Sequence, residues 1–425
     1  MTATGGATLP ASGSKGEDEE IRTLVSDVKE KLEEAEAMEA SAADLEENLE
    51  YREAKEVFKR ALDIRVGALG NEHVLVARSL NCMGCCLATL GKYVEAASLH
   101  QSALDICEAR NYRQGVATSI GHLGAAMLKQ GHFFRAKEYC NRAVEMKTRL
   151  LGGRHPSVAH SLNDLGMVMY ELSDLVGAER CFAEALDITN DEGNLEAARS
   201  LGGLGMVMWE YDSYQKSEVH HRKALAIAKR MASDGHPAIA ESLTNVGVAI
   251  SCQGRLSEAE EYHYQALAMR KRVLGDEHPD VGESLNNIAT VLGEQGRLPE
   301  AVHCHWRALT IWEQSLGRCH PCVASSLRWL GRLMSQQERF CEAEQYHRRE
   351  LSIRQKVYGC RHAEAAWSLF DLGLALRNQD KLVEAEDVLE TCLEVEKGLP
   401  GYNAGNAAAA ITELDKIREQ KSDIQ

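Results

Sequence analysis

Histidine is the residue type whose spacing first suggests chemistry in this 425-residue chain, because five histidines occur at one recurring position. Neutral imidazole binds zinc and also relays protons, so a row of such side chains could form a metal or proton path. The five are His100, His221, His263, His305 and His347. Members of the row should lie on the order of 10 Å apart, as neighbouring helices do, whereas zinc ligands lie ~2.1 Å from one ion. Cys140, Phe182 and Leu389 occupy the same position elsewhere, so we interpret it as a packing slot for a medium-sized side chain.

The 13 cysteines are a second possible source of chemistry. Cys82, Cys85 and Cys86 lie close together, and a compact run extends from Cys319 to Cys322. Neither group is followed by a second Cys/His pair at zinc-finger spacing. The first twenty residues contain no apolar segment typical of a secretory signal, so we expect a cytoplasmic chain with free thiols. The sequence therefore predicts no metal ion and no cofactor.

Charge and motif content exclude further classes of protein. The formal charge of −16, from 48 Lys and Arg against 64 Asp and Glu, disfavours nucleic acid as a partner. No segment approaches the ~18 consecutive apolar residues that a membrane span needs. Phosphate-binding loops, nucleophile elbows and zinc-protease motifs are also missing from the sequence. We therefore expect a protein that is not an enzyme, binds no nucleic acid and does not insert into a membrane.

The elements that carry these residues repeat along the chain. An apolar residue, two variable residues, a second apolar residue and then a small residue recur at intervals of 39 to 42 residues. The small residues are Gly84, Gly124, Gly166, Gly205, Gly247, Ala289, Gly331 and Gly373. Twelve residues after each lies another small residue, such as Ala259, and seven residues further usually an alanine, such as Ala266. Because seven residues make two helical turns, each unit should contain two helices that approach closely through these positions.

Glycine and proline mark the ends of the expected helices. Gly254-Arg255-Leu256 is a turn signal inside one unit, and the segment from Leu274 to Pro279 joins two units. Glycine suits a helix C-terminus, and proline suits the first turn of the next helix. One hairpin cannot bury both of its faces, but stacked hairpins share a continuous core. The sequence thus predicts an all-α superhelical solenoid of about nine helix hairpins with a C-terminal capping helix.

The motif L-x-x-L-G followed by G-[KR]-x-x-E-A and A-L resembles the tetratricopeptide repeat. The 42-residue form, with L-G-x-x-H-P between units, is similar to the arrays of kinesin light chains and nephrocystin-3-like proteins. Two stretches that carry the resemblance are GDEHPDVGESLNNIATVLGEQGRLPEAVHCHWRALTIW and GRHPSVAHSLNDLGMVMYELSDLVGAERCFAEALDI. The resemblance covers roughly residues 50 to 395. It implies a scaffold that binds other proteins through peptide segments, although such arrays serve many assemblies.

The two ends of the chain differ from the repeats. Residues 1–16 are rich in Gly, Ser, Thr and Ala and should be disordered, and residues 17–48 should form an acidic helix that includes helix A of the first repeat. Residues 49–397 form the expected array, and residues 398–425 the capping helix and tail. Residues 1–50 contain 14 acidic and 4 basic side chains, a net charge of −10. The acidic helix could be structural, a short dimerising coiled coil or an inhibitory segment, and the oligomeric state, with a monomer as one option, stays open.

The resemblance also implies which residues line the concave face. In tetratricopeptide arrays these are helix A residues three before and one after the motif glycine, together with residues one turn further on. Carried onto this chain, they predict a peptide-binding surface of Asn163, Met167, Tyr170, Gly202, Met206, Trp209, Asn286, Arg328 and Arg332. Its middle should be apolar, and Gly202 would let a ligand backbone come close. Arg328 and Arg332 would bind a carboxylate, in a stretch, residues 297–361, whose net charge is +5.

These residues predict a scaffold that holds a peptide segment with apolar and acidic residues in its concave groove. Two alternatives stay open. One is a kinesin light chain-like cargo adaptor of a microtubule motor, although those proteins have a much longer heptad segment before the array. The other is a self-inhibited regulatory module, in which the acidic N-terminal segment occupies the groove until a ligand displaces it. The sequence specifies neither the partner nor the pathway.

Overall fold

The computed structural model describes residues 15–189, 194–399 and 404–424, which form nineteen α-helices and no strand. The helices are α1 (Lys15–Glu47), α2 (Tyr51–Leu69), α3 (Val74–Thr89), α4 (Tyr93–Ala109), α5 (Arg113–Lys129), α6 (Phe133–Leu151), α7 (Pro156–Glu171), α8 (Leu175–Thr189), α9 (Leu195–Glu210), α10 (Tyr214–Met231), α11 (Pro237–Ser251), α12 (Leu256–Leu274), α13 (Pro279–Glu294), α14 (Leu298–Ser315), α15 (Pro321–Gln336), α16 (Phe340–Tyr358), α17 (Ala363–Arg377), α18 (Leu382–Lys397) and α19 (Ala404–Ile424). The disorder expected for residues 1–16 falls almost entirely outside the described residues, and α1 begins at Lys15.

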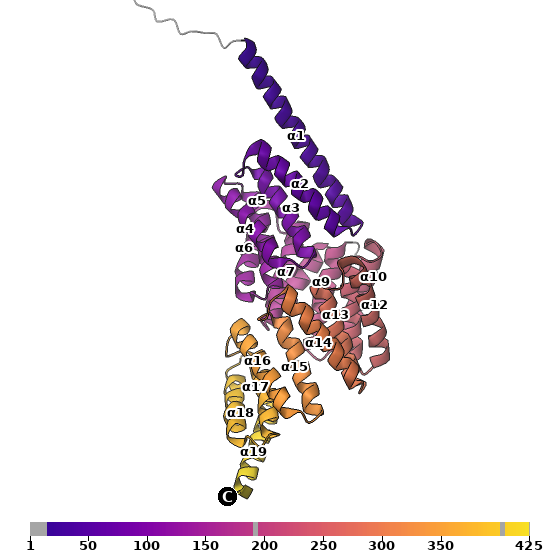
Figure 1. Cartoon of the computed structure of the whole chain (residues 1–425), viewed down its shortest axis with the longest axis vertical. Coiled ribbons are helices and arrows are strands. Elements are labelled where there is room, and N and C mark those ends of the chain that lie inside the picture. The colour runs from indigo at the N-terminus through magenta and orange to yellow at the C-terminus, as the bar shows by residue number, and fades with distance from the viewer. Residues whose placement is uncertain (1–14, 190–193, 400–403, 425) are drawn as a thin grey trace, which may run out of the picture.

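Consecutive helices pair into hairpins, and the hairpins stack along the chain (Figure 1). Odd-numbered helices from α1 to α17 are the A helices and even-numbered helices are the B helices, and each A helix from α3 onward also touches the next A helix. The helix α19 covers the last hairpin and buries Ala407, Ala410, Leu414 and Ile417. The expected all-α solenoid of about nine hairpins with a capping helix is confirmed. The N-terminal part of α1 projects from the array and exposes Leu24, whereas its C-terminal part packs on α2 (Figure 1).

Each hairpin closes around the small residue of helix A. A Cβ atom on Gly205 would stand 2.5 Å from the ring of His221 in the partner helix, so the ring occupies the space that a side chain at position 205 would take. Phe182 fills the same slot and is enclosed on a second side, because a Cβ atom on Gly203 of the next unit would collide with its ring. Burial lowers the pKa of His221 to about 4, so its ring is neutral at pH 7. These contacts confirm that the recurring histidine position is a packing slot.

The His-Pro pair between units begins the next A helix. The backbone N–H of Asp280 donates to Nδ1 of His278 at 3.1 Å, and Pro279 follows in the first helical turn, where its missing N–H costs nothing. Capping of the same kind recurs at His155, His236 and His320. These prolines and histidines therefore set where α7, α11, α13 and α15 begin.

Two of these capping histidines also connect units that are far apart in the sequence. Nε2 of His278 donates to the backbone carbonyl of Thr89 at 2.9 Å, and Nε2 of His320 donates to that of Lys129 at 3.0 Å. Pro279 packs against Gly91, where φ is +74° and an added Cβ would stand 2.6 Å from the proline ring. The hairpin turns of units two and three thus contact the linkers before units seven and eight.

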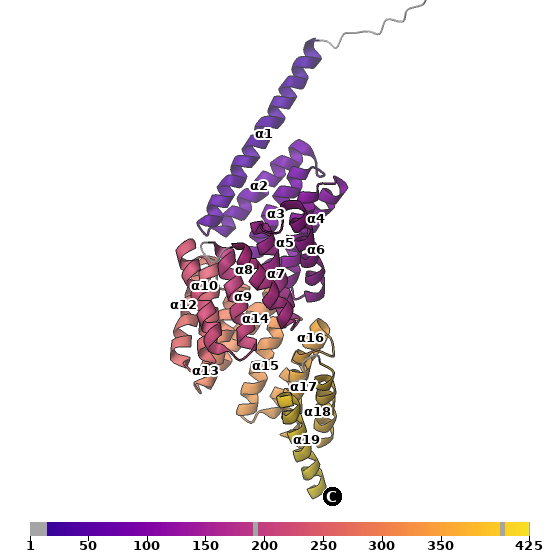
Figure 2. The ribbon, with the colours of Figure 1, turned by 180° about the vertical axis from the view of Figure 1, so that it is seen from behind.

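The superhelix therefore closes on itself after about five units. In Figure 1 α13 and α15 lie in front of α7 and α9, and in Figure 2, seen from behind, the order is reversed. The A helices of these units face one another across the interior. As a result, the middle of the concave face is enclosed by the chain itself.

Candidate functional site

The enclosed middle of the array contains a cavity of about 310 Å³, which we call the central cavity. Met167 and Met206, both predicted as peptide anchors, are half-buried and line it. Charged side chains from distant units line it as well, among them Lys129, Glu171 and Asp280. The apolar middle expected from the sequence is therefore only one part of this lining, because the closed turn adds residues from five units further along.

The charges of the central cavity compensate one another. Burial opposes ionisation of Lys129, but Tyr93, Asp280 and other nearby acids hold its pKa above the usual value. Burial also raises the pKa of Glu171 to about 7, although Lys129 acts in the opposite direction. Glu171 thus gains and loses its proton near neutral pH.

Tyr170 and Trp209 lie at the C-terminal ends of their A helices and are half-buried. The hydroxyl of Tyr170 donates to Oε1 of Glu210 at 2.9 Å, and Nε1 of Trp209 donates to Sγ of Cys252 at 3.0 Å. Each side chain thus spans to the next unit. Nearby, Gly202 is buried, and a Cβ atom added to it would make only an ordinary contact with Nδ2 of Asn245, at 3.8 Å.

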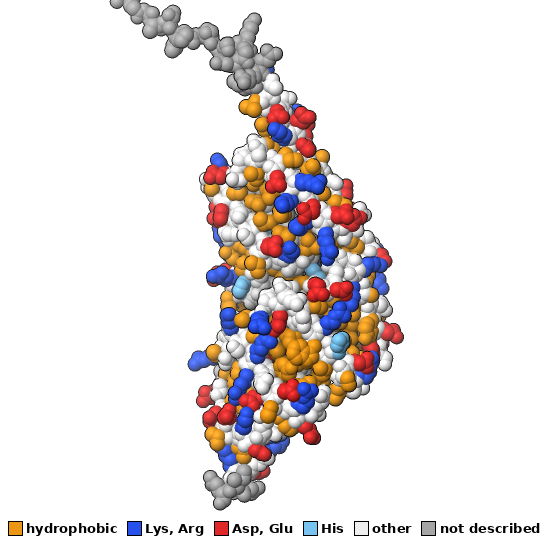
Figure 3. Space-filling model, viewed as in Figure 1, with side chains coloured by type: hydrophobic (Ala, Val, Ile, Leu, Met, Phe, Trp, Pro, Cys, Tyr) orange, Lys and Arg blue, Asp and Glu red, His pale blue; other side chains and the backbone are white. Residues whose placement is uncertain are grey.

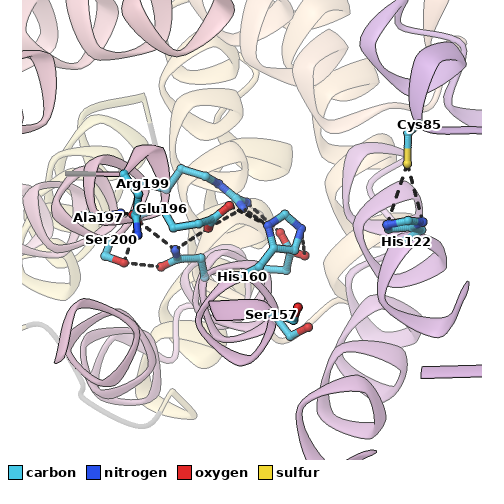
Figure 4. A network of polar contacts seen from close by, with 12 residues as sticks. Cys85, His122, Ser157, His160, Glu196, Ala197, Arg199 and Ser200 are labelled. Carbon is cyan, nitrogen blue, oxygen red and sulfur yellow. Dashed lines mark hydrogen bonds and ion pairs between the residues drawn. The ribbon is translucent and has the colours of Figure 1, made fainter. Parts of the chain in front are cut away.

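The structure places Asn163 inside the packing between α7 and α9 rather than on an open surface. It is 1% exposed, and its Nδ2 donates to the carbonyl and the carboxylate of Glu196 at 3.2 and 3.0 Å (Figure 4). Its Oδ1 accepts from the hydroxyl of Ser200 at 2.8 Å. Asn286 is also tied into the packing, since its Oδ1 accepts from Nδ1 of His305 at 3.0 Å and from the hydroxyl of Ser326 at 3.4 Å. Both asparagines therefore join neighbouring units.

An ion network surrounds Asn163. Nδ1 of His160 donates to Glu196 at 2.7 Å, and the guanidinium of Arg199 reaches Asp164 at 2.7 Å and Glu196 at 3.2 Å (Figure 4). Burial opposes ionisation of Glu196, but His160 and Arg199 lower its pKa to about 2. The carboxylate stays charged at pH 7 and fixes α7 against α9.

The sequence contains a further signal for this packing. A serine stands five residues before the small residue of every A helix from α3 to α17. These serines are Ser79, Ser119, Ser161, Ser200, Ser242, Ser284, Ser326 and Ser368, and all are buried. Ser284, for example, accepts from Nη1 of Arg270 at 2.8 Å. The fixed spacing alone indicates a buried polar contact shared by the units.

Arg328 and Arg332 are brought together as predicted, and they line a C-terminal pocket of about 250 Å³. Both guanidinium groups pair with Asp371, at 3.0 and 3.1 Å. Arg328 also lies over the ring of Trp367 at 5.1 Å from its centroid. Burial opposes ionisation of Asp371, but the two arginines lower its pKa, so the carboxylate is charged. One carboxylate serves two cations, beside Trp367, Phe370 and a second buried carboxyl group, that of Glu396. Burial raises the pKa of Glu396, which opposes a negative charge there.

A third hollow, the N-terminal pocket, was missed by the sequence reasoning. It measures about 640 Å³ and lies between the A helices α1, α3 and α5. Glu36 and Glu46 of α1 line one side, and Cys85 and His122 line the other. Figure 4 shows Cys85 and His122 pointing toward each other. The first A helix lies in the acidic N-terminal segment, where no L-G motif indicates which residues face inward.

The stacked hairpins, the glycine-lined contacts and the inward-facing A helices define a superhelical repeat protein, in which each unit packs mainly on its neighbours. A profile of the tetratricopeptide repeat matches residues 33–109, 115–191, 196–271, 238–314, 285–356 and 322–397. The chain belongs to this family, and the resemblance inferred from the sequence is confirmed. A sequence comparison with curated proteins finds no match.

Several solved structures are similar to this one. A Rap protein complexed with competence and sporulation factor aligns with a TM-score of 0.54 and 16% identity over 92% of this chain and 100% of its own. The Cut9–Hcn1 assembly of the APC/C aligns with a TM-score of 0.57 and 14% identity over 85% of this chain and 59% of that one. A putative kinesin light chain with nearly identical TPR-like repeats, from Podosopora anserina, aligns with a TM-score of 0.40 and 22% identity over 48% of this chain and 97% of its own.

Among the described residues, none of the helices combines the length and the apolar character that crossing a bilayer would require.

Proposed function

We propose that this protein is a non-enzymatic scaffold that binds a peptide segment carrying acidic and apolar residues on its interior face. The observation that supports this most is the C-terminal pocket, where Arg328 and Arg332 share Asp371 beside aromatic side chains. Membership of the tetratricopeptide repeat family supports the coarser statement, a protein-interaction scaffold. A structurally similar array is described in complex with competence and sporulation factor, and we extend ligand binding to this chain.

The unused N–H donors of Arg328 and Arg332 favour a carboxylate as the ligand group of the C-terminal pocket. A guanidinium has five N–H donors, and Asp371 accepts through Nε of both arginines and Nη2 of Arg332. The remaining donors, and the half-exposed position of Arg332, are available to a second carboxylate. Such charge-assisted bonds are roughly twice as strong as neutral ones. An acidic peptide side chain therefore replaces water here at a net gain.

Apolar side chains beside the arginines would hold the rest of the peptide. Trp367 and Phe370 form a wall of the C-terminal pocket, and aromatic residues are typical anchors of interfaces. On the face shown in Figure 3, hydrophobic side chains also gather over α15, with Lys and Arg side chains close by. We place the acidic residue of the peptide at Arg328 and Arg332, and an apolar neighbour against Trp367.

The predicted anchors Met167 and Met206, which line the central cavity, form a second part of the proposal. The central cavity, about 310 Å³, is at the lower end of the range of ligand pockets. It accepts a side chain or two, rather than an extended backbone, while the superhelical turn is closed. A peptide side chain that fills it would enter between units, near Met206 and Asn245.

The proposal is tested by probing a peptide array with the purified full chain and with the variant R328E/R332E. The variant should lose the acidic-apolar peptides that the unaltered chain binds. R110E/R142E is the matched control, because both arginines form exposed ion pairs, with Glu72 and Glu108, and the charge change is the same. An array pattern that R328E/R332E leaves unchanged would contradict the proposal.

The buried carboxylate needs a second variant, because R328E/R332E leaves Asp371 without a cation. R328Q/R332Q/D371N removes all three charges together, so no buried carboxylate is left without a partner and the fold is not destabilised in that way. Its binding should fall as well, and circular dichroism should show an unchanged helix content. Retained binding by this neutral variant would mean that the arginine charges do not bind the peptide.

A further inference from the structure

Three side chains that can bind a metal ion meet where α3, α4 and α5 pack together. Cys85 lies on α3, His100 on α4 and His122 on α5, and one ligand atom of each lies within 4.8 Å of the other two. The sulfur of Cys85 lies 3.6 Å from Nδ1 of His122 (Figure 4), and the two imidazole centroids are 5.0 Å apart. Around tetrahedral zinc, with bonds of about 2.3 Å to sulfur and about 2.0 Å to nitrogen, ligand atoms lie about 3.5 Å apart. The cluster is therefore close to the spacing that zinc requires.

A hydrogen-bond chain behind His100 fixes the protonation of its ring. Nδ1 of His100 donates to Oδ1 of Asn81 at 2.9 Å, and Nδ2 of Asn81 donates to the hydroxyl of Ser119 at 2.8 Å. Because Nδ1 carries the proton, Nε2 keeps a free lone pair. Histidines that bind metals typically have this support, in which the second ring nitrogen donates to an oxygen.

Both imidazoles are also in the protonation state that binds metals. Burial lowers the pKa of His100 to about 4. Burial, with a contribution from His100, lowers the pKa of His122 to about 3. Both rings are therefore neutral at pH 7, and neutral imidazole is the form that coordinates a cation.

The other histidine slots of the array do not have this constellation. His263 occupies the same slot as His100, but Val248 and Asn287 stand at the positions that correspond to Cys85 and His122. This cluster differs from the ladder of equivalent histidines considered in the sequence analysis. Its three ligands come from three different positions of the repeat, so they can lie close together. The group of His347, Glu350 and Asp371 differs, since arginines already neutralise its carboxylates.

We infer that Cys85, His100 and His122 form a zinc-binding site at the inner wall of the N-terminal pocket. Cys85 and His122 line that pocket, so a fourth coordination position faces it and takes water or a side chain of a bound partner. Burial raises the pKa of the Cys85 thiol to about 12, so the thiol is protonated without metal. Zinc binding replaces the S–H bond by a Zn–S bond and releases one proton to solvent.

The test is titration of the purified, metal-free full chain with Zn²⁺, followed by elemental analysis and isothermal titration calorimetry. One zinc ion per chain should bind, with release of a proton. Titration with Co²⁺ should produce the thiolate-to-cobalt absorption of a site with a sulfur ligand. Bound zinc should also protect Cys85 from alkylation, as read by mass spectrometry of the digested chain.

The variants C85A and H122N use residues that the array already accepts at these positions, namely Ala125 and Asn245. Loss of a supporting hydrogen bond weakens metal binding by about 10–100-fold. C85A and H122N each remove a ligand, so each should weaken zinc binding by more than that. N81T, for which Thr244 of another unit is the precedent, should weaken it by about 10–100-fold. C252A and H263L are the matched controls, with Leu389 as the precedent for the second, and both should bind zinc as the unaltered chain does.

Three results would overturn the inference: no stoichiometric zinc in the unaltered chain, equal affinity in C85A and H122N, or alkylation of Cys85 unaffected by zinc. The alkylation measurement uses the unaltered chain, so it decides the question even where a variant fails to fold. Cobalt bound without a sulfur absorption would place the ion elsewhere.

Discussion

The cross-turn bonds of His278 and His320 lead to the most specific prediction about stability. In H278N the asparagine can still cap α13, because its side-chain oxygen accepts the same backbone N–H. It is too short to reach the carbonyl of Thr89, with which His278 bonds at 2.9 Å. The substitution therefore removes the contact between units two and seven and keeps the helix cap.

The expected loss of stability follows from the backbone carbonyl of Thr89, which is left without its hydrogen bond. His278 is 6% exposed, so the carbonyl of Thr89 loses its partner in a region with little water. Leaving such a group unsatisfied costs about 1–3 kcal/mol. His155 is the matched control, because it caps α7 in the same way and is exposed. H155N should therefore change the free energy of unfolding by no more than about 0.5 kcal/mol.

Urea denaturation of both variants measures the difference, and small-angle scattering measures the shape. H278N/H320N should lose about twice as much stability as H278N and should have a larger radius of gyration, because the turn opens. Equal stability of H278N and H155N, together with unchanged scattering of the double variant, would refute a superhelix held closed by these bonds.

Other residues lead to three further predictions. The pKa of Glu171 is raised to about 7, so the folded state favours its protonated form. The stability that this group contributes is therefore fully present below pH ~4.5 and is lost as the pH rises through 7. In urea titrations, the free energy of unfolding of the unaltered chain, compared with that of E171Q, should be lower at pH 8 than at pH 5. A difference between the two proteins that is the same at both pH values would disprove this. G203A should lower the free energy of unfolding by about 1–3 kcal/mol, because the added Cβ collides with the ring of Phe182. In thermal melts, the additional substitution F182L should restore part of the lost stability. N163A should lower the free energy of unfolding by about 1–3 kcal/mol, because Ser200 and Glu196 lose hydrogen-bond partners. Peptide binding should stay unchanged. Reduced peptide binding by a variant of full stability would contradict an interior role of Asn163.

Much of the fold follows from local residue patterns. The spacing of glycines such as Gly205 and Gly331 predicted the hairpins, because each glycine admits the side chain opposite it. The same spacing predicted that Arg328 and Arg332 lie one turn apart and point together, and the shared Asp371 agrees with that geometry. Contacts within a unit or between neighbours depend on nearby residues, so one period contains most of the information.

Closure of the turn could not be predicted in this way. It depends on small rotations that accumulate over five units, and His278-Pro279 reads as a linker motif until the turn of Thr89 to Gly91 is found beside it. Asn163 illustrates a second limit, because its position faces inward by register, but a neighbouring Glu196 covers it. The cluster around Cys85 was missed because its ligands stand at three different positions of the repeat.

The proposed function is tested most directly by hydrogen exchange of the full chain with and without the tightest peptide from the array. The account predicts that the peptide slows exchange in α15 and α17, the helices that carry Arg328, Arg332 and Trp367, and that R328Q/R332Q/D371N abolishes this protection. Protection confined to the B helices α14 and α16, or protection that survives in the variant, would contradict it.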